Sequence, residues 1–219
     1  MKAAFFDLDR TLLDVNSGVL WARHELKRRQ IGPLQFAQAM GWALAYHLSL
    51  VDMNVMYRRA LSHYRGKSAR EIEAETQRWF LGQVERRLRP GARAALAEHR
   101  ARGELLVVLT NASPYEAQIA AQRFGMDAWI SNVYLEDERG CLLGDFEPPL
   151  CVGAGKLERA QRWSQAHGVR LSESTFYTDS YTDLQVLEAV AAPRVIAPDP
   201  RLRRIAAKRQ WPILDWGKA

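Results

Sequence analysis

Cysteine is scarce in this sequence, with only Cys141 and Cys151 among 219 residues. The two do not form a CxxC pair and do not belong to a histidine cluster, which argues against a disulfide framework and against a structural zinc site. We expect both to be plain thiols in a reducing cytoplasm. The sequence also lacks zinc-finger spacing and the aromatic signature of RNA-binding modules, so we expect no nucleic-acid partner.

Long hydrophobic runs are absent as well. The most apolar stretch, residues 36–51, contains Gln38, Gly41, His47 and Ser49 and falls short of the run of about 20 residues that spans a bilayer. The apolar segment at the start of the chain is interrupted by Asp7 and has neither the apolar core nor the cleavage site of a signal peptide. These features predict neither secretion nor a transmembrane helix.

Charge and composition fit an ordinary folded protein. Lys plus Arg number 31 against 25 Asp plus Glu, a net charge of +6, which favours anionic ligands in general. The basic pairs Arg28–Arg29, Arg58–Arg59 and Arg86–Arg87 are spread along the chain, so most of this charge is expected on solvated helix faces. Apolar residues make up 47% and charged residues 26%, which suffices for a packed core.

Short apolar segments that end in polar residues recur along the chain. They are the pattern of buried parallel strands and cover residues 2–6, 105–109, 175–178 and 194–197. Segments with helical periodicity lie between them, around 92–102, 115–124, 156–167 and 182–190. Strands that alternate with helices predict an α/β fold, a doubly wound parallel sheet of the Rossmann type.

Residues 17–89 interrupt this alternation with helical periodicity alone. We expect about four helices there, inserted directly after the first strand and its loop, and therefore placed over the loop end of the sheet as a cap. The predicted organisation is an α/β core at 1–16 plus 90–219 and an all-helical cap at 17–89. Residues 133–146 alternate about Arg139–Gly140, which predicts a small β-hairpin.

Asp7 and Asp9 leave the first predicted strand together, two residues apart. Ligands of such sheets bind beyond the carboxyl ends of the strands. One carboxylate of such a pair can attack phosphorus, while the other protonates the leaving alkoxide and then activates water. The alternative is a turn or helix cap after the strand, and the motif by itself does not decide between the two.

The other strand ends favour the catalytic interpretation. Thr110 and Asn111 follow the second strand before Pro114 and are suited to holding phosphoryl oxygens, although Thr110 is also a good N-cap residue. Lys156 opens a helix, where its ammonium could neutralise a nucleophile and a phosphate, or simply lie on the surface.

Asp179 and Asp183 come at the end of the strand 175–178, four residues apart. Hard oxygen ligands of this kind suit Mg²⁺, which is commonly held by one or two carboxylates. A helix cap explains Asp183 but not the second carboxylate at the strand end.

Together, DxDxT at residues 7–11, a strand-ending threonine, a lysine that opens a helix and DxxxD at 179–183 resemble the motifs of the haloacid dehalogenase superfamily of phosphatases. The helical insert between the first two motifs is similar to that of the phosphoserine-phosphatase-like branch. The resemblance implies Asp7 as nucleophile, Asp9 as general acid and base, Thr110, Asn111 and Lys156 as phosphate ligands, and Mg²⁺ bound by Asp7, the backbone carbonyl of Asp9, Asp179 and Asp183.

Two positions depart from the family pattern and are candidate substrate contacts. Arg10 stands where Gly, Asn, Ser or His is common, and Asn16 stands nine residues after the nucleophile, where phosphoserine phosphatases carry the glutamate that holds the substrate amine. A neutral amide makes a weaker bond to an ammonium group than a carboxylate does, so we expect L-phosphoserine to be a poor substrate.

We therefore expect a Mg²⁺-dependent phosphomonoester hydrolase that forms an aspartyl phosphate and acts on a small phosphorylated metabolite. A phosphotransferase or mutase would use the same residues. A third possibility is a phosphatase of phospholipid or lysophospholipid phosphates in peripheral contact with an anionic membrane, because apolar residues crowd into the predicted cap. The alternative, which the pattern favours, is that these residues pack the helical core of the cap itself. These are Phe36, Met40, Trp42, Leu44, Tyr46, Leu48, Leu50, Val51, Met53, Val55 and Met56.

Overall fold

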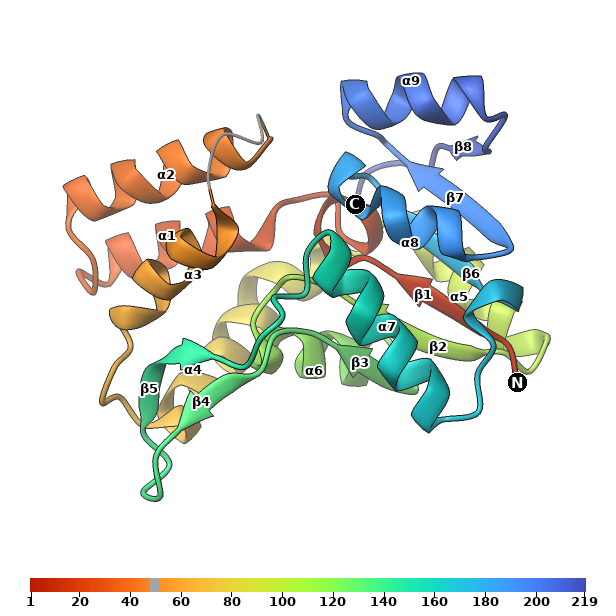
Figure 1. The fold of residues 1–219 in the computed structure, drawn as a ribbon. Coiled ribbons are helices and arrows are strands. Elements are labelled where there is room, and N and C mark those ends of the chain that lie inside the picture. The colour runs from red at the N-terminus through yellow and green to blue at the C-terminus, as the bar shows by residue number, and fades with distance from the viewer. Residues whose placement is uncertain (48–51) are drawn as a thin grey trace.

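The computed structural model describes residues 1–47 and 52–219, of which residues 39 and 42–47 are described by their backbone alone. Its main sheet has six parallel strands in the order β3-β2-β1-β6-β7-β8 (Figure 1). The strands are β1 Ala3–Phe6, β2 Leu105–Leu109, β3 Ala128–Ile130, β6 Thr175–Thr178, β7 Ala192–Ile196 and β8 Ile213–Leu214. Counted along the chain this is the order 3-2-1-4-5-6, so the predicted doubly wound α/β sheet is confirmed.

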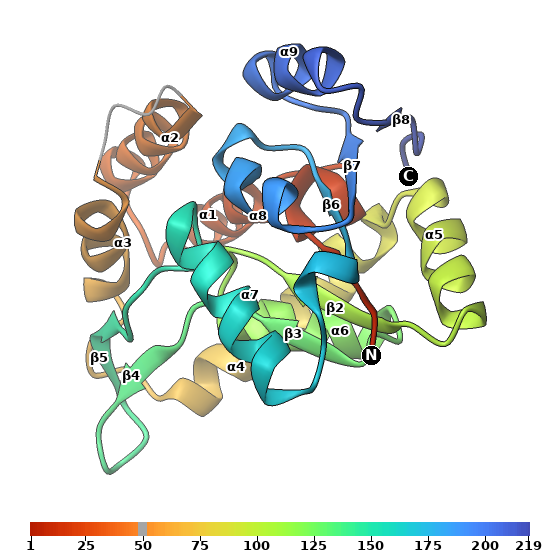
Figure 2. The ribbon, with the colours of Figure 1, turned by 45° about the vertical axis from the view of Figure 1, so that its right-hand side comes forward.

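Helices cover both faces of the sheet because its strands alternate buried side chains between two cores. Ala4 and Phe6 of β1 face one core, and Ala3 and Phe5 face the other. Helices α5 Pro90–Ala101 and α6 Pro114–Arg123 pack on the first face. Helices α7 Ala154–Ala166, α8 Leu184–Ala189 and α9 Pro200–Lys208 pack on the second, and α7 lies in front of the strands in Figure 2.

Four helices occupy the described part of the segment that follows β1. They are α1 Ser17–Lys27, α2 Pro33–His47, α3 Met53–Ser62 and α4 Ala69–Trp79. Helices α1, α2 and α3 lie together beyond the carboxyl ends of the strands, at the left of Figure 1. The end of α4 and the turn after it return to the core, where Trp79, Phe80 and Val84 are buried.

The predicted hairpin is present as β4 Tyr134–Glu136 and β5 Leu142–Phe146, which pair antiparallel. It is bonded to the connection between α3 and α4, because the Gly66 amide donates to the Leu142 carbonyl at 2.8 Å and the Leu142 amide donates to the Lys67 carbonyl at 2.9 Å. The hairpin thus extends the helical segment, although it lies far from that segment in sequence.

Short turns of 3-10 or π type complete the secondary structure of the described residues, at Phe80–Val84, Glu85–Arg87, Leu171–Glu173 and Tyr181–Asp183. Leu8–Leu12 is a tight loop, because Asp9 and Arg10 inside it have non-helical dihedral angles. The pattern of the sequence does not predict the short strands β3 and β8 or helix α9, and β7 begins at Ala192 rather than at residue 194.

Gly155, in the first turn of α7, packs against the preceding loop more closely than a larger residue allows. A Cβ built there would lie 2.1 Å from the Leu150 carbonyl oxygen and 2.9 Å from Cβ of Pro149. We expect Gly155→Ala to lower the free energy of unfolding by about 1–3 kcal/mol, as overpacking does, and to reduce turnover because Lys156 moves with the helix. Thermal unfolding and phosphate release check this. Gly82→Ala is the control, since a Cβ there meets nothing within 4 Å, and equal behaviour of the two variants would contradict the prediction.

Candidate active site

A cavity of about 700 Å³ lies where the carboxyl ends of β1, β2 and β6 meet the helical segment. Its floor carries Asp7, Thr110 and Asp179, and its walls come from α1, α2 and α3. The strand order reverses between β1 and β6, and ligands of doubly wound sheets bind at this switch point. The structure therefore gathers the predicted strand-end residues in one concave site.

Lys156 lies at the centre of a buried ion-pair network. Its ammonium donates to Asp7 Oδ1 at 2.8 Å and to Asp183 Oδ2 at 2.6 Å, and the Thr178 hydroxyl also donates to Asp183 Oδ2 at 2.6 Å. Lys156 is 2% exposed, so the surface position that the sequence left open is excluded. Burial disfavours its charged form, but Asp183 and Asp7 outweigh burial and raise the pKa of Lys156 well above its usual range.

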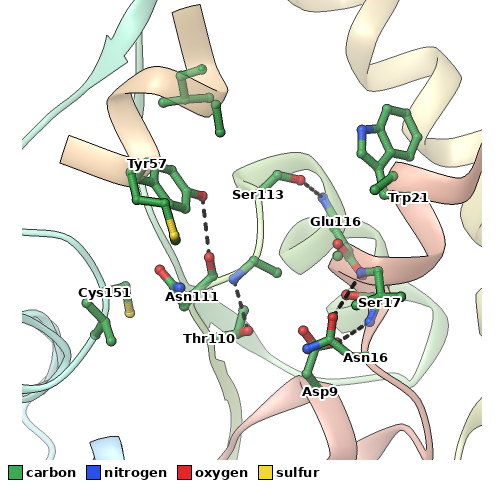
Figure 3. A pocket seen from close by; sticks show the side chains of 18 of the residues that line it. Asp9, Asn16, Ser17, Trp21, Tyr57, Thr110, Asn111, Ser113, Glu116 and Cys151 are labelled. Carbon is green, nitrogen blue, oxygen red and sulfur yellow. Dashed lines mark hydrogen bonds between the residues drawn. The ribbon is translucent and has the colours of Figure 1, made fainter. Parts of the chain in front are cut away.

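Asp9 has a different environment from Asp7. Its Oδ1 accepts a 2.7 Å hydrogen bond from the Ser17 amide at the start of α1 (Figure 3). Burial raises the pKa of Asp9, and Ser17 and the positive charges of Arg10 and Lys156 act in the opposite direction. The two carboxylates of the first motif thus have different partners, one a lysine and the other a main-chain amide.

Thr110 and Asn111 line the cavity at the end of β2. The Thr110 hydroxyl accepts from the Ala112 amide at 3.1 Å, while the N-cap of α6 is Ser113, whose hydroxyl accepts from the Glu116 amide at 3.1 Å (Figure 3). Thr110 is therefore not the helix cap that the sequence left as an alternative.

Asn132 supports this loop and was not predicted. It is fully buried, and its Nδ2 donates to the Asn111 carbonyl and to the Tyr57 hydroxyl, both at 2.9 Å. Its Oδ1 accepts from the Cys151 amide at 2.8 Å. One side chain thus connects the loop after β2, helix α3 and the loop before α7.

The two candidate substrate contacts, Arg10 and Asn16, both line the cavity. Arg10 has a φ of 57°, a left-handed conformation that Gly and Asn adopt more easily than arginine does. Asn16 is the N-cap of α1, with Oδ1 accepting from the Val19 amide at 2.9 Å.

The donor set of the site fits Mg²⁺. Burial, followed by the nearby carboxylates, raises the pKa of Asp179 well above its usual range, and burial also raises that of Asp7 to about 7 despite Lys156. A divalent cation bound between Asp7 and Asp179 would offset the repulsion between their negative charges. Within the described residues, no group of three or more His, Cys, Asp or Glu side chains can hold a metal ion. Mg²⁺ does not need such a cage, because one or two carboxylates and several waters suffice.

The apolar residues of the helical segment are only partly described. Met40, Met53 and Met56 line the cavity, and Val55 is exposed. The side chains of Trp42, Leu44 and Tyr46, and the whole of Leu48, Leu50 and Val51, lie outside the described residues. Among the described residues, no helix combines the length and the apolarity that crossing a bilayer requires. Both cysteines are free, as predicted.

Known proteins resemble this chain over nearly its whole length. A family model for haloacid dehalogenase-like hydrolases matches residues 4–188. Phosphoserine phosphatase SerB1 of Mycobacterium tuberculosis is 31% identical over 98% of this chain and 70% of its own length. A histidinol-phosphatase of Neisseria meningitidis is 24% identical over 97% and 98% of the two chains.

Solved structures show the same fold. A Bordetella pertussis protein of unknown function superposes with a TM-score of 0.87 and 27% identity over 99% of each chain. A phospho-aspartyl intermediate analogue of phosphoserine phosphatase superposes with a TM-score of 0.70 and 16% identity over 99% of this chain and 94% of its own. The chain belongs to the haloacid dehalogenase-like hydrolase family and, within it, to the phosphatases that resemble phosphoserine phosphatase.

Proposed function

We propose that this phosphatase hydrolyses the phosphomonoester of a small metabolite through an aspartyl phosphate on Asp7, with Mg²⁺ as cofactor. The observation that carries the proposal is the buried contact of Lys156 with Asp7. The ammonium favours the ionised carboxylate that a nucleophile needs, and it lies beside the position that a transferring phosphoryl group would take. The names of the relatives, phosphoserine phosphatase and histidinol-phosphatase, support a small substrate.

In the first half-reaction an oxygen of Asp7 attacks phosphorus, the bond from phosphorus to the leaving oxygen breaks, and Asp9 gives its proton to that oxygen. In the second, Asp9 takes a proton from water, the hydroxide attacks phosphorus, and the bond to Asp7 breaks, which releases phosphate. Lys156 and the donors of the Thr110–Asn111 loop hold the phosphoryl oxygens. Mg²⁺ bound by Asp7, Asp179 and the Asp9 carbonyl would offset the negative charge that develops there.

Asp183 has a supporting place in this proposal. Its Oδ2 accepts from both Lys156 and Thr178, so it holds the lysine toward Asp7, and its contribution to the metal site is through its charge. Residues 17–89 are proposed to act as the cap that encloses the leaving group, since α1, α2 and α3 line the cavity opposite the strand ends. Closure would exclude water from the first half-reaction.

A phosphate-release screen tests the proposed function. The chain is incubated with Mg²⁺ and amino-acid, sugar, nucleotide and glycerolipid phosphates, and inorganic phosphate is measured. We expect release from at least one small ester and its loss when the metal is chelated. No release from any ester would contradict hydrolysis, and transfer of the phosphoryl group to an added alcohol instead of water would show a phosphotransferase.

The glycerolipid members of the panel address the lipid alternative. Met40, Met53 and Met56 give the cavity an apolar side, which is the observation that favours an acyl chain. Sedimentation with anionic vesicles that salt reverses, together with faster release from lysophosphatidate than from soluble esters, would support a lipid substrate. No vesicle binding at low salt and a preference for a polar ester would exclude it.

A further inference from the structure

Glu116 is a buried acid in the cavity that the catalytic proposal does not use. It lies in the first turn of α6, three residues after the N-cap Ser113. This spacing predicts a capping box, in which the glutamate side chain turns back to the amide of the capping residue. Instead, the Glu116 carboxylate points toward Ser17 and the Asp9 side of the cavity (Figure 3).

The side chain is poorly satisfied where it lies. Glu116 is 5% exposed, and its Oε1 has no hydrogen-bond partner in the described part of the chain. Burial and then the negative charge of Asp9 raise the pKa of Glu116 to about 8, although the side chain of Ser17 lowers this pKa. A buried acceptor without a partner costs stability, so a partner supplied by the ligand would account for its presence in a binding cavity.

Glu116 lies on the Asp9 side of the cavity (Figure 3). The charged group that affects it is Asp9, the proposed proton donor to the leaving oxygen, whereas Lys156 and Asp183 lie together with Asp7 on the phosphoryl side. A group bound at Glu116 would therefore belong to the alcohol part of the ester.

Asn16 cannot supply a negative charge to the same part of the cavity. It is neutral, and its Oδ1 is already used to cap α1 through the Val19 amide. Glu116 lines the same cavity from a different element of the fold, close to Ser17, which follows Asn16 in the chain. A carboxylate is thus available near the leaving group although position 16 carries none.

We infer that Glu116 is a specificity residue that binds an ammonium group, or a comparable cationic N–H donor, on the leaving group of the substrate. This inference rests on the proposed function. A charge-assisted hydrogen bond inside a cavity is worth about ten- to a hundredfold in affinity or efficiency.

Matched ester pairs test the inference. 2-Aminoethyl phosphate and propyl phosphate have nearly the same size but differ in charge, as do 3-aminopropyl and butyl phosphate. At pH 8 with Mg²⁺, we expect kcat/KM to favour the amine in at least one pair by about tenfold or more. Glu116→Gln should abolish that preference and retain hydrolysis of the alkyl ester. Glu25→Gln, which changes another buried acid of the cavity, should keep the preference.

The outcomes separate the inference from the proposed function. Equal efficiency on both members of both pairs in the wild type overturns the inference, whether or not the variant folds. An equal loss on the aminoalkyl and the alkyl esters in Glu116→Gln would show an effect on Asp9 instead and also overturn the inference. Loss of the preference in Glu25→Gln alone would overturn it too. No phosphate release from these esters or from p-nitrophenyl phosphate would overturn the proposed function and the inference with it.

Discussion

Asp7→Asn is expected to reduce phosphate release at least about a thousandfold, as loss of a nucleophile does in enzymes of covalent mechanism. Asparagine nearly preserves the shape of the side chain but not the negative charge that Lys156 binds at 2.8 Å, and an amide is a poor nucleophile toward phosphorus. The measurement is phosphate release with Mg²⁺ and the best ester of the screen.

Trapping of the covalent intermediate gives this prediction a second readout. Wild-type protein quenched with acid during turnover of a ³²P-labelled ester should retain label that hydroxylamine removes, as expected for an acyl phosphate, and Asp7→Asn should retain none. Asp145→Asn is the control, because Asp145 lies on β5 in an exposed pair with Arg58, and exposed pairs contribute little. Turnover by Asp7→Asn near the wild-type rate would contradict the proposed mechanism, in which Asp7 is the nucleophile.

The core strands of the sheet could be predicted because each is buried on both faces and ends in a polar residue. β1, β2 and β6 follow this pattern, and their ends carry Asp7, Thr110 and Asp179. Parallel strands bring their carboxyl ends to one edge of the sheet. The strand pattern alone therefore predicts that three segments far apart in sequence form one site.

The edge strands could not be predicted in the same way. β3 has three residues and β8 has two, which is too short for a periodic signal, and both are defined by pairing with β2 and β7. Asn132 follows β3 and was missed for this reason, since its place at a strand end is visible only once the strand is known.

Glu116 was missed for a different reason. Its spacing from Ser113 has an ordinary local explanation as a capping box. Only the folded chain brings Ser17, at the start of α1, and Asp9, after β1, near it. The burial of Lys156 could not be predicted either, because a lysine at the start of a helix is usually exposed. Lys156 is buried in ion pairs with Asp7 and Asp183, which lie far from it in sequence. Contacts between distant segments decide both cases.

Lys156→Met is expected to lower the free energy of unfolding by about 3–5 kcal/mol, which for a chain of this size lowers the melting temperature by roughly 6 to 20 °C. The physical reason is the loss of the cation shared by two buried carboxylates, Asp7 and Asp183, which then repel each other without compensation. Thermal and denaturant unfolding measure the effect. Arg162→Met on the same helix is the matched control, because its pair with Glu158 is exposed and should contribute less than about 1 kcal/mol.

A double variant separates charge from packing in this prediction. If uncompensated charge causes the loss, Asp183→Asn added to Lys156→Met removes one of the two carboxylates and should restore part of the stability, although Asp183→Asn alone weakens the network. If lost packing of the lysine stem causes it, the second substitution should restore nothing. A Lys156→Met protein as stable as Arg162→Met would contradict the prediction. Replacing a buried ion pair as a whole is often neutral, whereas removing one partner leaves a buried charge uncompensated and is expected to destabilise the protein.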